Sequence, residues 1–238
     1  AGDCLHAVFE AIDFTRNDGW PQAISHALQT HPQRLDGLAP APMQARLAAM
    51  LTQAVRNVLS TELPGGFTLA SVPRSRTLVE LGFHLPAQGL DARALDQVLS
   101  AAGLPTSRLS FARLDGFLKG FIDLVFEQGG RYYIADWKSN YLGAGSGDYA
   151  QPQLQRAMDD HGYTLQYLLY TVALHRYLAR RLPGYRYADH FGGVYYLFAR
   201  GMRPGWIDDS DGLVAPCGVC FRRPDQSLVQ ALDRWVDG

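Results

Sequence analysis

Residues 120–138 read GFIDLVFEQGGRYYIADWK, and this stretch decides the predicted fold. Phe117–Phe126 and Arg131–Lys138 are rich in aromatic and β-branched residues, which favour strands. The segment between them, Glu127-Gln128-Gly129-Gly130, is typical of a tight turn, either of two residues (Gln128-Gly129) or of all four. The stretch therefore predicts a β-hairpin.

Three polar side chains share one face of this predicted hairpin. Either turn places Asp123 opposite Ile134, and Asp136 and Lys138 follow at two-residue steps on the same face. Asp123 and Asp136 are then diagonal neighbours, with Cβ atoms about 7–8 Å apart. Two carboxylates at this spacing can bind Mg²⁺, and Lys138 can steady or help deprotonate an attacking water. The alternative is an ordinary hairpin with a solvated polar face, on which an Asp136–Lys138 ion pair contributes at most about 1 kcal/mol.

The first 64 residues predict helices. Asp3 can cap a first helix, and Pro21 and Pro42 each suit the first turn of a later one. The apolar stripe of the first helix consists of Leu5, Val8, Phe9 and Ile12. This stripe leaves His6 and Glu10 together on another face.

Beyond Gly65-Gly66 the helical hydrophobic period ends, and strand-like and helical segments follow one another. The predicted elements are a strand-like stretch over Phe67–Leu85, a helix over Asp91–Ala102, one or two helices over Tyr149–Leu182 with a break at Gly162, a strand over Phe191–Ala199 and a helix over Asp225–Val236. We therefore expect a single domain, residues 1–238, with a helical N-terminal part (1–64) that carries His6 and an α/β core (65–238).

The charge balance excludes a strongly basic, free-standing DNA-binding module. The formal net charge is −1, so a polyanion must be held locally, by metal ions or by a partner. Arginines cluster between Arg176 and Arg203, at Arg180, Arg181, Arg186 and Arg200. A solvated helix face and an arginine-rich loop explain this run slightly better than a nucleic-acid patch.

Other motifs narrow the class of protein. No apolar run of 18 residues and no leader pattern occur, which predicts a cytoplasmic protein without a membrane partner. No P-loop occurs, so this chain is not itself an ATP-driven motor. Cys217-x-x-Cys220 and Cys4 are the only cysteines, and since an iron–sulfur cluster needs four thiolates, we expect none; a two-cysteine zinc site is no better supported.

The hairpin motifs occur together with other short motifs along the chain. Gly120-Phe-Ile-Asp123, Asp136-Trp-Lys138, Gln166 and Tyr170 four apart on a helix, and Leu5-His6 near the start resemble the RecB family of PD-(D/E)XK nucleases. The resemblance covers most of 116–202, and further towards the N-terminus it is confined to 3–14 and 80–86. It implies a restriction-endonuclease-like α/β core with a mixed sheet flanked by helices.

The resemblance also implies a role for individual residues. His6, Asp123 and Asp136 would ligate the metal with the backbone carbonyl of Trp137, and Lys138 would be the catalytic lysine. Gln166 and Tyr170 match the family's Q-x-x-x-Y motif and would line the site or touch DNA. Glu80 stands where the family has an acidic residue near the metal, although a solvated strand face explains it almost as well.

The implied activity is a Mg²⁺-dependent DNA exonuclease and endonuclease, with Mn²⁺ able to replace Mg²⁺. By resemblance this activity belongs to a RecBCD-type helicase–nuclease in double-strand-break repair and DNA degradation. The implied partners are DNA, mainly single-stranded, the RecC and RecD subunits, and RecA. Two other interpretations stay open: a non-catalytic module on a nuclease fold that docks DNA or RecA, and, less favoured by the cysteine count, a free-standing iron–sulfur nuclease.

Overall fold

The computed structural model describes residues 2–33, 39–104, 114–209, 212 and 214–237. Its centre is a five-stranded sheet with the strand order β3-β4-β5-β6-β9. The strands are β3 (Thr77–Leu90), β4 (Leu114–Gln128), β5 (Arg131–Lys138), β6 (Phe191–Phe198) and β9 (Val219–Arg222). Only β5 and β6 pair in parallel, so the sheet is mixed, as predicted.

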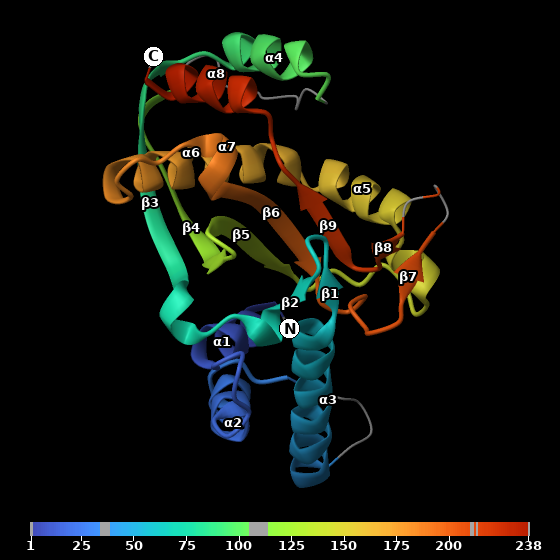
Figure 1. Ribbon diagram of the computed structural model, residues 1–238. Coiled ribbons are helices and arrows are strands. Elements are labelled where there is room, and N and C mark those ends of the chain that lie inside the picture. The colour runs from blue at the N-terminus through green and yellow to red at the C-terminus, as the bar shows by residue number, and fades with distance from the viewer. Residues whose placement is uncertain (1, 34–38, 105–113, 210–211, 213, 238) are drawn as a thin grey trace.

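Helices cover both faces of this sheet (Figure 1). One face, here called the α6 face, packs against α5 (Gln151–Asp160), α6 (Tyr163–Arg181) and α8 (Gln226–Asp237), with α4 (Ala92–Ala101) beside α8. The opposite α1 face packs against α1 (Gly2–Ala11), α2 (Trp20–Thr30) and α3 (Pro40–Ser60). The central strand β6 is buried along its whole length because both of its faces are covered.

Helices form in the N-terminal part as predicted, but α1 begins at Gly2, so Asp3 lies inside the helix and does not cap it. The four stripe residues of the first helix are all buried. Pro21 lies in the first turn of α2, where its missing N–H leaves no hydrogen bond unmade. The third helix begins at Pro40, two residues before the predicted Pro42, and buries only its C-terminal half, at Val55, Val58 and Leu59.

The hairpin turn lies one residue later than predicted. Gly129 and Gly130 form a two-residue turn with φ of 60° and 79°, and Gln128 pairs with Arg131. Such a turn needs positive φ at both central residues, which glycine adopts without strain. Ile134 therefore pairs with Val125, and the predicted pairing of Asp123 with Ile134 was wrong. One step beyond the Leu124–Ala135 pair, Asp123 is level with Asp136, so the two are direct rather than diagonal neighbours.

The strand-like stretch Phe67–Leu85 is divided. It contains the short β2 (Phe67–Thr68), two 3₁₀ turns (Leu69–Ser71 and Arg74–Arg76) and only then β3. Within β3 and β4 the side chains change face where Glu80 and Asp123 are level. Residues two apart on either side of this point belong to different cores: Val79 and Leu81 on β3, and Leu124 and Ile122 on β4.

On β3 this change of face occurs at Glu80, a residue with a strained backbone conformation. Residues two apart in a regular strand share a face. Glu80 has φ of 49° and is the one non-glycine residue with positive φ in the described part of the chain. This conformation reverses the side-chain alternation of β3, so that Leu81 points to the opposite face from Val79.

The C-terminal half contains more strands than predicted. Gly162, in a left-handed conformation, separates α5 from α6 as expected, and β6 and α8 also confirm their predictions. Strand β9 and three other short elements of this half were missed: β7 (Ile207–Asp208), β8 (Ala215–Pro216) and α7 (Tyr187–His190). The two-residue β1 (Glu62–Leu63) was missed in the N-terminal half. A 3₁₀ turn (Ser146–Tyr149) precedes α5. Among the described residues no helix is both long and apolar enough to cross a membrane.

Candidate active site

Asp136 and Lys138 lie at the C-terminal end of β5 and share the α6 face. Strand β5 is central, so the Asp136 side chain is only 3% exposed and that of Lys138 12%. The Lys138 Nζ lies 2.5 Å from Asp136 Oδ2. This oxygen is buried and the ion pair gives it no well-directed hydrogen bond. The lysine therefore balances the charge of the carboxylate but leaves the hydrogen-bonding capacity of Oδ2 unfilled.

Burial sets the electrostatics of Asp136. Desolvation first, and then the charge of Asp123, raise the pKa of Asp136 to about 6 against the opposing effect of Lys138. A carboxyl that titrates near neutral pH in a pocket with a second carboxylate is a common sign of a functional site.

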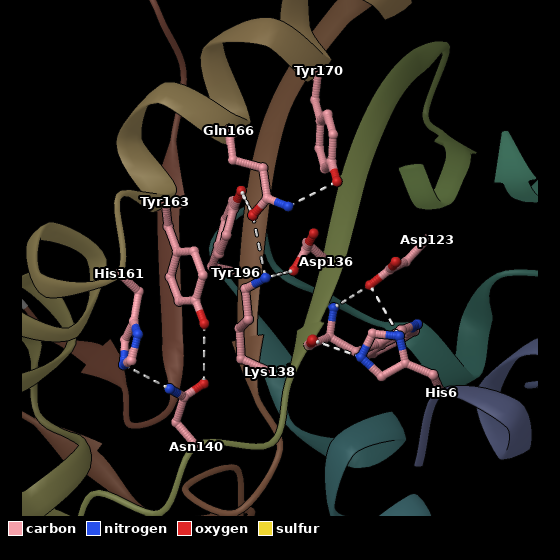
Figure 2. A network of polar contacts seen from close by, with 11 residues as sticks. His6, Asp123, Asp136, Lys138, Asn140, His161, Tyr163, Gln166, Tyr170 and Tyr196 are labelled. Atoms are coloured by element: carbon pink, nitrogen blue, oxygen red, sulfur yellow. Dashed lines mark hydrogen bonds and ion pairs between the residues drawn. The ribbon is translucent and has the colours of Figure 1, made fainter. Parts of the chain in front are cut away.

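A hydrogen-bonded chain connects Lys138 to α6 (Figure 2). The Lys138 Nζ donates to Gln166 Oε1 over 3.2 Å, and Tyr196 OH donates to the same oxygen over 2.9 Å. Gln166 Nε2 in turn donates to Tyr170 OH over 2.8 Å. Gln166 and Tyr170 face the strand together because residues four apart share one side of a helix. Figure 2 shows Lys138 between Asp136 and Gln166.

Asp123 and His6 form a second group beside the first. The backbone N–H of Trp137 donates to Asp123 Oδ2 over 2.9 Å, and His6 Nδ1 lies 3.6 Å from that same oxygen. His6 Nε2 is 2.9 Å from the Trp137 carbonyl oxygen, which can only accept, so Nε2 carries a proton in this contact. The Phe9 ring stacks on the Trp137 indole with centroids 4.1 Å apart and holds α1 in place.

Two glutamates extend the group towards solvent. Glu80 is exposed and level with Asp123 across the β3–β4 pair. Burial first, and then the charge of Glu80, raise the pKa of Glu10, which also shares a hydrogen bond with Glu80. The structure thus brings Glu80 to the edge of the site although its side chain is solvated. Glu10 was not proposed as a site residue; its place four residues after His6 was the available signal.

Two tyrosines were also missed. The Tyr163 ring lies 4.0 Å from Lys138 Nζ, and the Tyr196 ring 5.0 Å. Tyr163 also donates from its hydroxyl to Asn140 Oδ1 over 3.5 Å. Tyr196 pairs with Asp136 in the parallel β5–β6 register, so it faces the same side. Neither tyrosine was named as a site residue, because the sequence predicts no strand order that would bring them to Lys138.

The three cysteines are placed on opposite sides of the sheet. Cys4 is buried in the core of the α1 face, whereas Cys217 and Cys220 are buried in the core of the α6 face. Burial raises the pKa of each thiol, which disfavours the thiolate that binds metals.

The donor atoms fit a hard divalent cation in type. Two carboxylates, an imidazole and a backbone carbonyl supply mainly oxygen ligands, as Mg²⁺ requires. The buried Asp136 Oδ2, which lacks a well-directed hydrogen bond, is an oxygen that a cation would satisfy. As the side chains stand, however, no three histidine, cysteine or acidic side chains of the described residues are arranged to hold an ion. Instead, Lys138 contacts the Asp136 carboxylate, and His6 contacts the Trp137 carbonyl oxygen.

Comparison with known proteins agrees with this geometry. A family model described as the PD-(D/E)XK nuclease superfamily matches residues 1–231. The RecBCD enzyme subunit RecB of Escherichia coli K12 is 38% identical over 244 residues, which cover 100% of this chain and 19% of that protein. The RecB subunit of Haemophilus influenzae is 40% identical over 185 residues (77% of this chain, 14% of that protein), and that of Mycolicibacterium smegmatis is 35% identical over 262 residues (99% and 24%). The chain thus spans about a fifth of the length of these relatives.

Proposed function

Because the chain belongs to the PD-(D/E)XK nuclease superfamily, we propose that it hydrolyses DNA phosphodiester bonds with the help of Mg²⁺, as the nuclease part of a RecBCD-type enzyme. The observation that carries this proposal is the buried Asp136–Lys138 pair, which is held by Gln166 next to a second carboxylate, Asp123. A solvated hairpin face would not remove an ion pair from water in this way.

The proposed metal ligands are His6, Asp123, Asp136 and the backbone carbonyl of Trp137, with Mn²⁺ able to replace Mg²⁺. A bound divalent cation would polarise a phosphoryl oxygen and lower the pKa of a water molecule. The contact between Trp137 N–H and Asp123 orients one carboxylate, and the stacked Phe9 ring fixes the position of His6. Glu80 and Glu10 add negative charge at the solvent side, where they would attract the cation.

Lys138 would act on the attacking water or on the charge that develops at the phosphate. Its ammonium is held by Gln166 and by the faces of Tyr163 and Tyr196, and these groups position the lysine without removing its charge. The Gln166–Tyr170 bond fixes the amide so that its oxygen, not its nitrogen, faces Lys138. We infer that Gln166 and Tyr170 line the DNA side of the site.

The names of the relatives suggest the biological context. Each is a RecBCD enzyme subunit, so we propose DNA repair as the process, single-stranded DNA as the main substrate, and RecC, RecD and RecA as partners. The cleavage itself would combine exonuclease and endonuclease modes.

Cleavage of an end-labelled single strand tests the catalytic proposal. We expect cleavage with Mg²⁺ and none with a chelator. Asp136→Ala and Lys138→Ala should each lower the rate by about 100-fold or more, since each removes charge that stabilises the transition state. Lys119→Ala is the matched control, because it removes the chain's other lysine from an exposed position on β4 and should leave the rate unchanged.

Two results would overturn the proposal. Equal cleavage by the parent and both site variants would mean that the chemistry lies elsewhere. DNA binding by the parent without cleavage at any Mg²⁺ concentration would favour the docking module.

A further inference from the structure

A groove lies beside the candidate site, between the edge strand β3 and helix α6. Its volume is about 410 Å³. At one end it is lined by Leu81 and Ile122, the chain neighbours of Glu80 and Asp123. At the other end it is lined by Tyr177, Arg180 and Arg181. The groove therefore adjoins the site at one end and is basic at the other.

The groove follows one side of α6. Gln166, Tyr170, Tyr177 and Arg181 are spaced at helical intervals, so the side that carries the site also carries the groove. Phe83, which lines the groove, packs edge-on against Tyr170 with ring centroids 5.7 Å apart. With a rise of 1.5 Å per residue, Tyr170 and Arg181 are roughly 16 Å apart along the helix, a length that suits a few nucleotides.

Two arginines at the far end have no acidic partner among the residues that the structure describes. Arg180 and Arg181 are exposed, and no ion pair of the described chain includes either. Arg176 differs, because it pairs with Asp233 and, over 2.7 Å, with Asp237. The lining contains three arginines and one acidic residue, Asp237, so the groove carries net positive charge.

We propose that this groove binds the phosphate backbone of the single strand that enters or leaves the site, with Arg180 and Arg181 as phosphate contacts. The inference rests on the proposed DNA substrate and adds the path of the strand. Guanidinium groups suit phosphate oxygens because their N–H donors form bidentate pairs. Tyr177 and Phe83 offer aromatic surface beside the backbone path, as in other single-strand grooves.

Binding of fluorescent dT30 in the presence of chelator tests the groove without catalysis. We expect Arg180→Glu/Arg181→Glu to raise the Kd at 0.1 M salt by about tenfold or more. The negative slope of log association constant against log salt concentration should also become shallower by about 1.4, since each lost single-strand phosphate contact removes about 0.7. The matched control is Arg46→Glu/Arg56→Glu, which makes the same charge change on two exposed arginines of α3, on the other side of the sheet.

A second measurement does not depend on affinity. Modification of arginines by phenylglyoxal, read by mass spectrometry, should be suppressed by saturating dT30 at Arg180 and Arg181 and not at Arg46 and Arg56. Equal Kd values for the two double variants, or equal protection of all four arginines, would overturn the groove. Failure of the parent to cleave DNA would contradict the proposed function alone, because both measurements are made without cleavage.

Discussion

Lys138 and Asp136 form an ion pair that is almost entirely removed from water, and this fixes what happens when one partner is lost. Lys138→Met keeps the length of the side chain but leaves the Asp136 carboxylate without its counter-ion. Loss of one partner of a buried pair costs about 3 kcal/mol or more. Asp136→Asn/Lys138→Met removes both charges and should recover most of that loss.

Urea unfolding in the presence of chelator measures both variants against the parent at about pH 9. The pKa of Asp136 is about 6, so at neutral pH protonation of the unpaired carboxyl would relieve most of the loss. The double variant is the control, because it carries the same lysine substitution without an uncompensated charge. A single variant as stable as the parent would show that the carboxylate is already neutral or hydrated, contrary to its 3% exposure.

The residues of the site differ in how far local sequence could place them. Alternation along β5 was sufficient to put Asp136 and Lys138 on one face. It was not sufficient for Asp123, because the register depends on which two residues form the turn and Gln128-Gly129-Gly130 allows more than one choice. Tyr196 depends on the parallel β5–β6 pairing, which joins residues 60 apart and leaves no local signal.

At the scale of the element, β3 keeps a strained residue at the point where it changes face. Glu80 has φ of 49°, which costs a residue with a Cβ atom about 1–2 kcal/mol and costs glycine little. Comparison of Glu80→Gly with Glu80→Ala isolates this strain, because both remove the carboxylate. We expect the glycine variant to be the more stable by about 1 kcal/mol, although glycine in a regular strand is normally the less stable by about 0.5–1 kcal/mol.

The free energies of unfolding of Glu80→Gly and Glu80→Ala are compared in urea. Substitutions at Val79 are the matched control. Val79→Gly should be less stable than Val79→Ala, since the strand is regular there and the side chain is partly buried. The same order at both positions would mean that β3 passes Glu80 without strain.

The elements themselves were predictable where they are long and periodic. Helices α4 and α8 begin and end within one residue of their predicted bounds. Strand β9 was missed because its four residues, Val219–Arg222, are too few to show alternation. Its role as an outer strand follows only from pairing with β6, a tertiary contact.

At the scale of the whole molecule, the two cores on either side of the sheet share its central strands. Tyr195 and Leu197 of β6 pack in the core of the α1 face, and Val194, Tyr196 and Phe198 in that of the α6 face. The helical N-terminal part therefore covers a sheet face that would otherwise be apolar and exposed. From this packing we infer that the helical part and the α/β core differ in their elements but fold as one unit.

We therefore expect the chain to unfold as one cooperative unit. Phe9→Ala removes a fully buried ring that stacks on Trp137, and should lower the free energy of unfolding by about 3 kcal/mol or more. Hydrogen exchange read by mass spectrometry should show this loss in residues 55–60 of α3 and equally in β6, because both are then protected only by global unfolding. Met50→Ala, at a side chain 53% exposed on α3, is the control. It should change the free energy of exchange in α3 and in β6 by less than about 0.5 kcal/mol. If Phe9→Ala instead lowered protection in α3 and left that of β6 intact, the N-terminal helices would form a separate unit, and their hold on His6 would be independent of the sheet that carries the carboxylates.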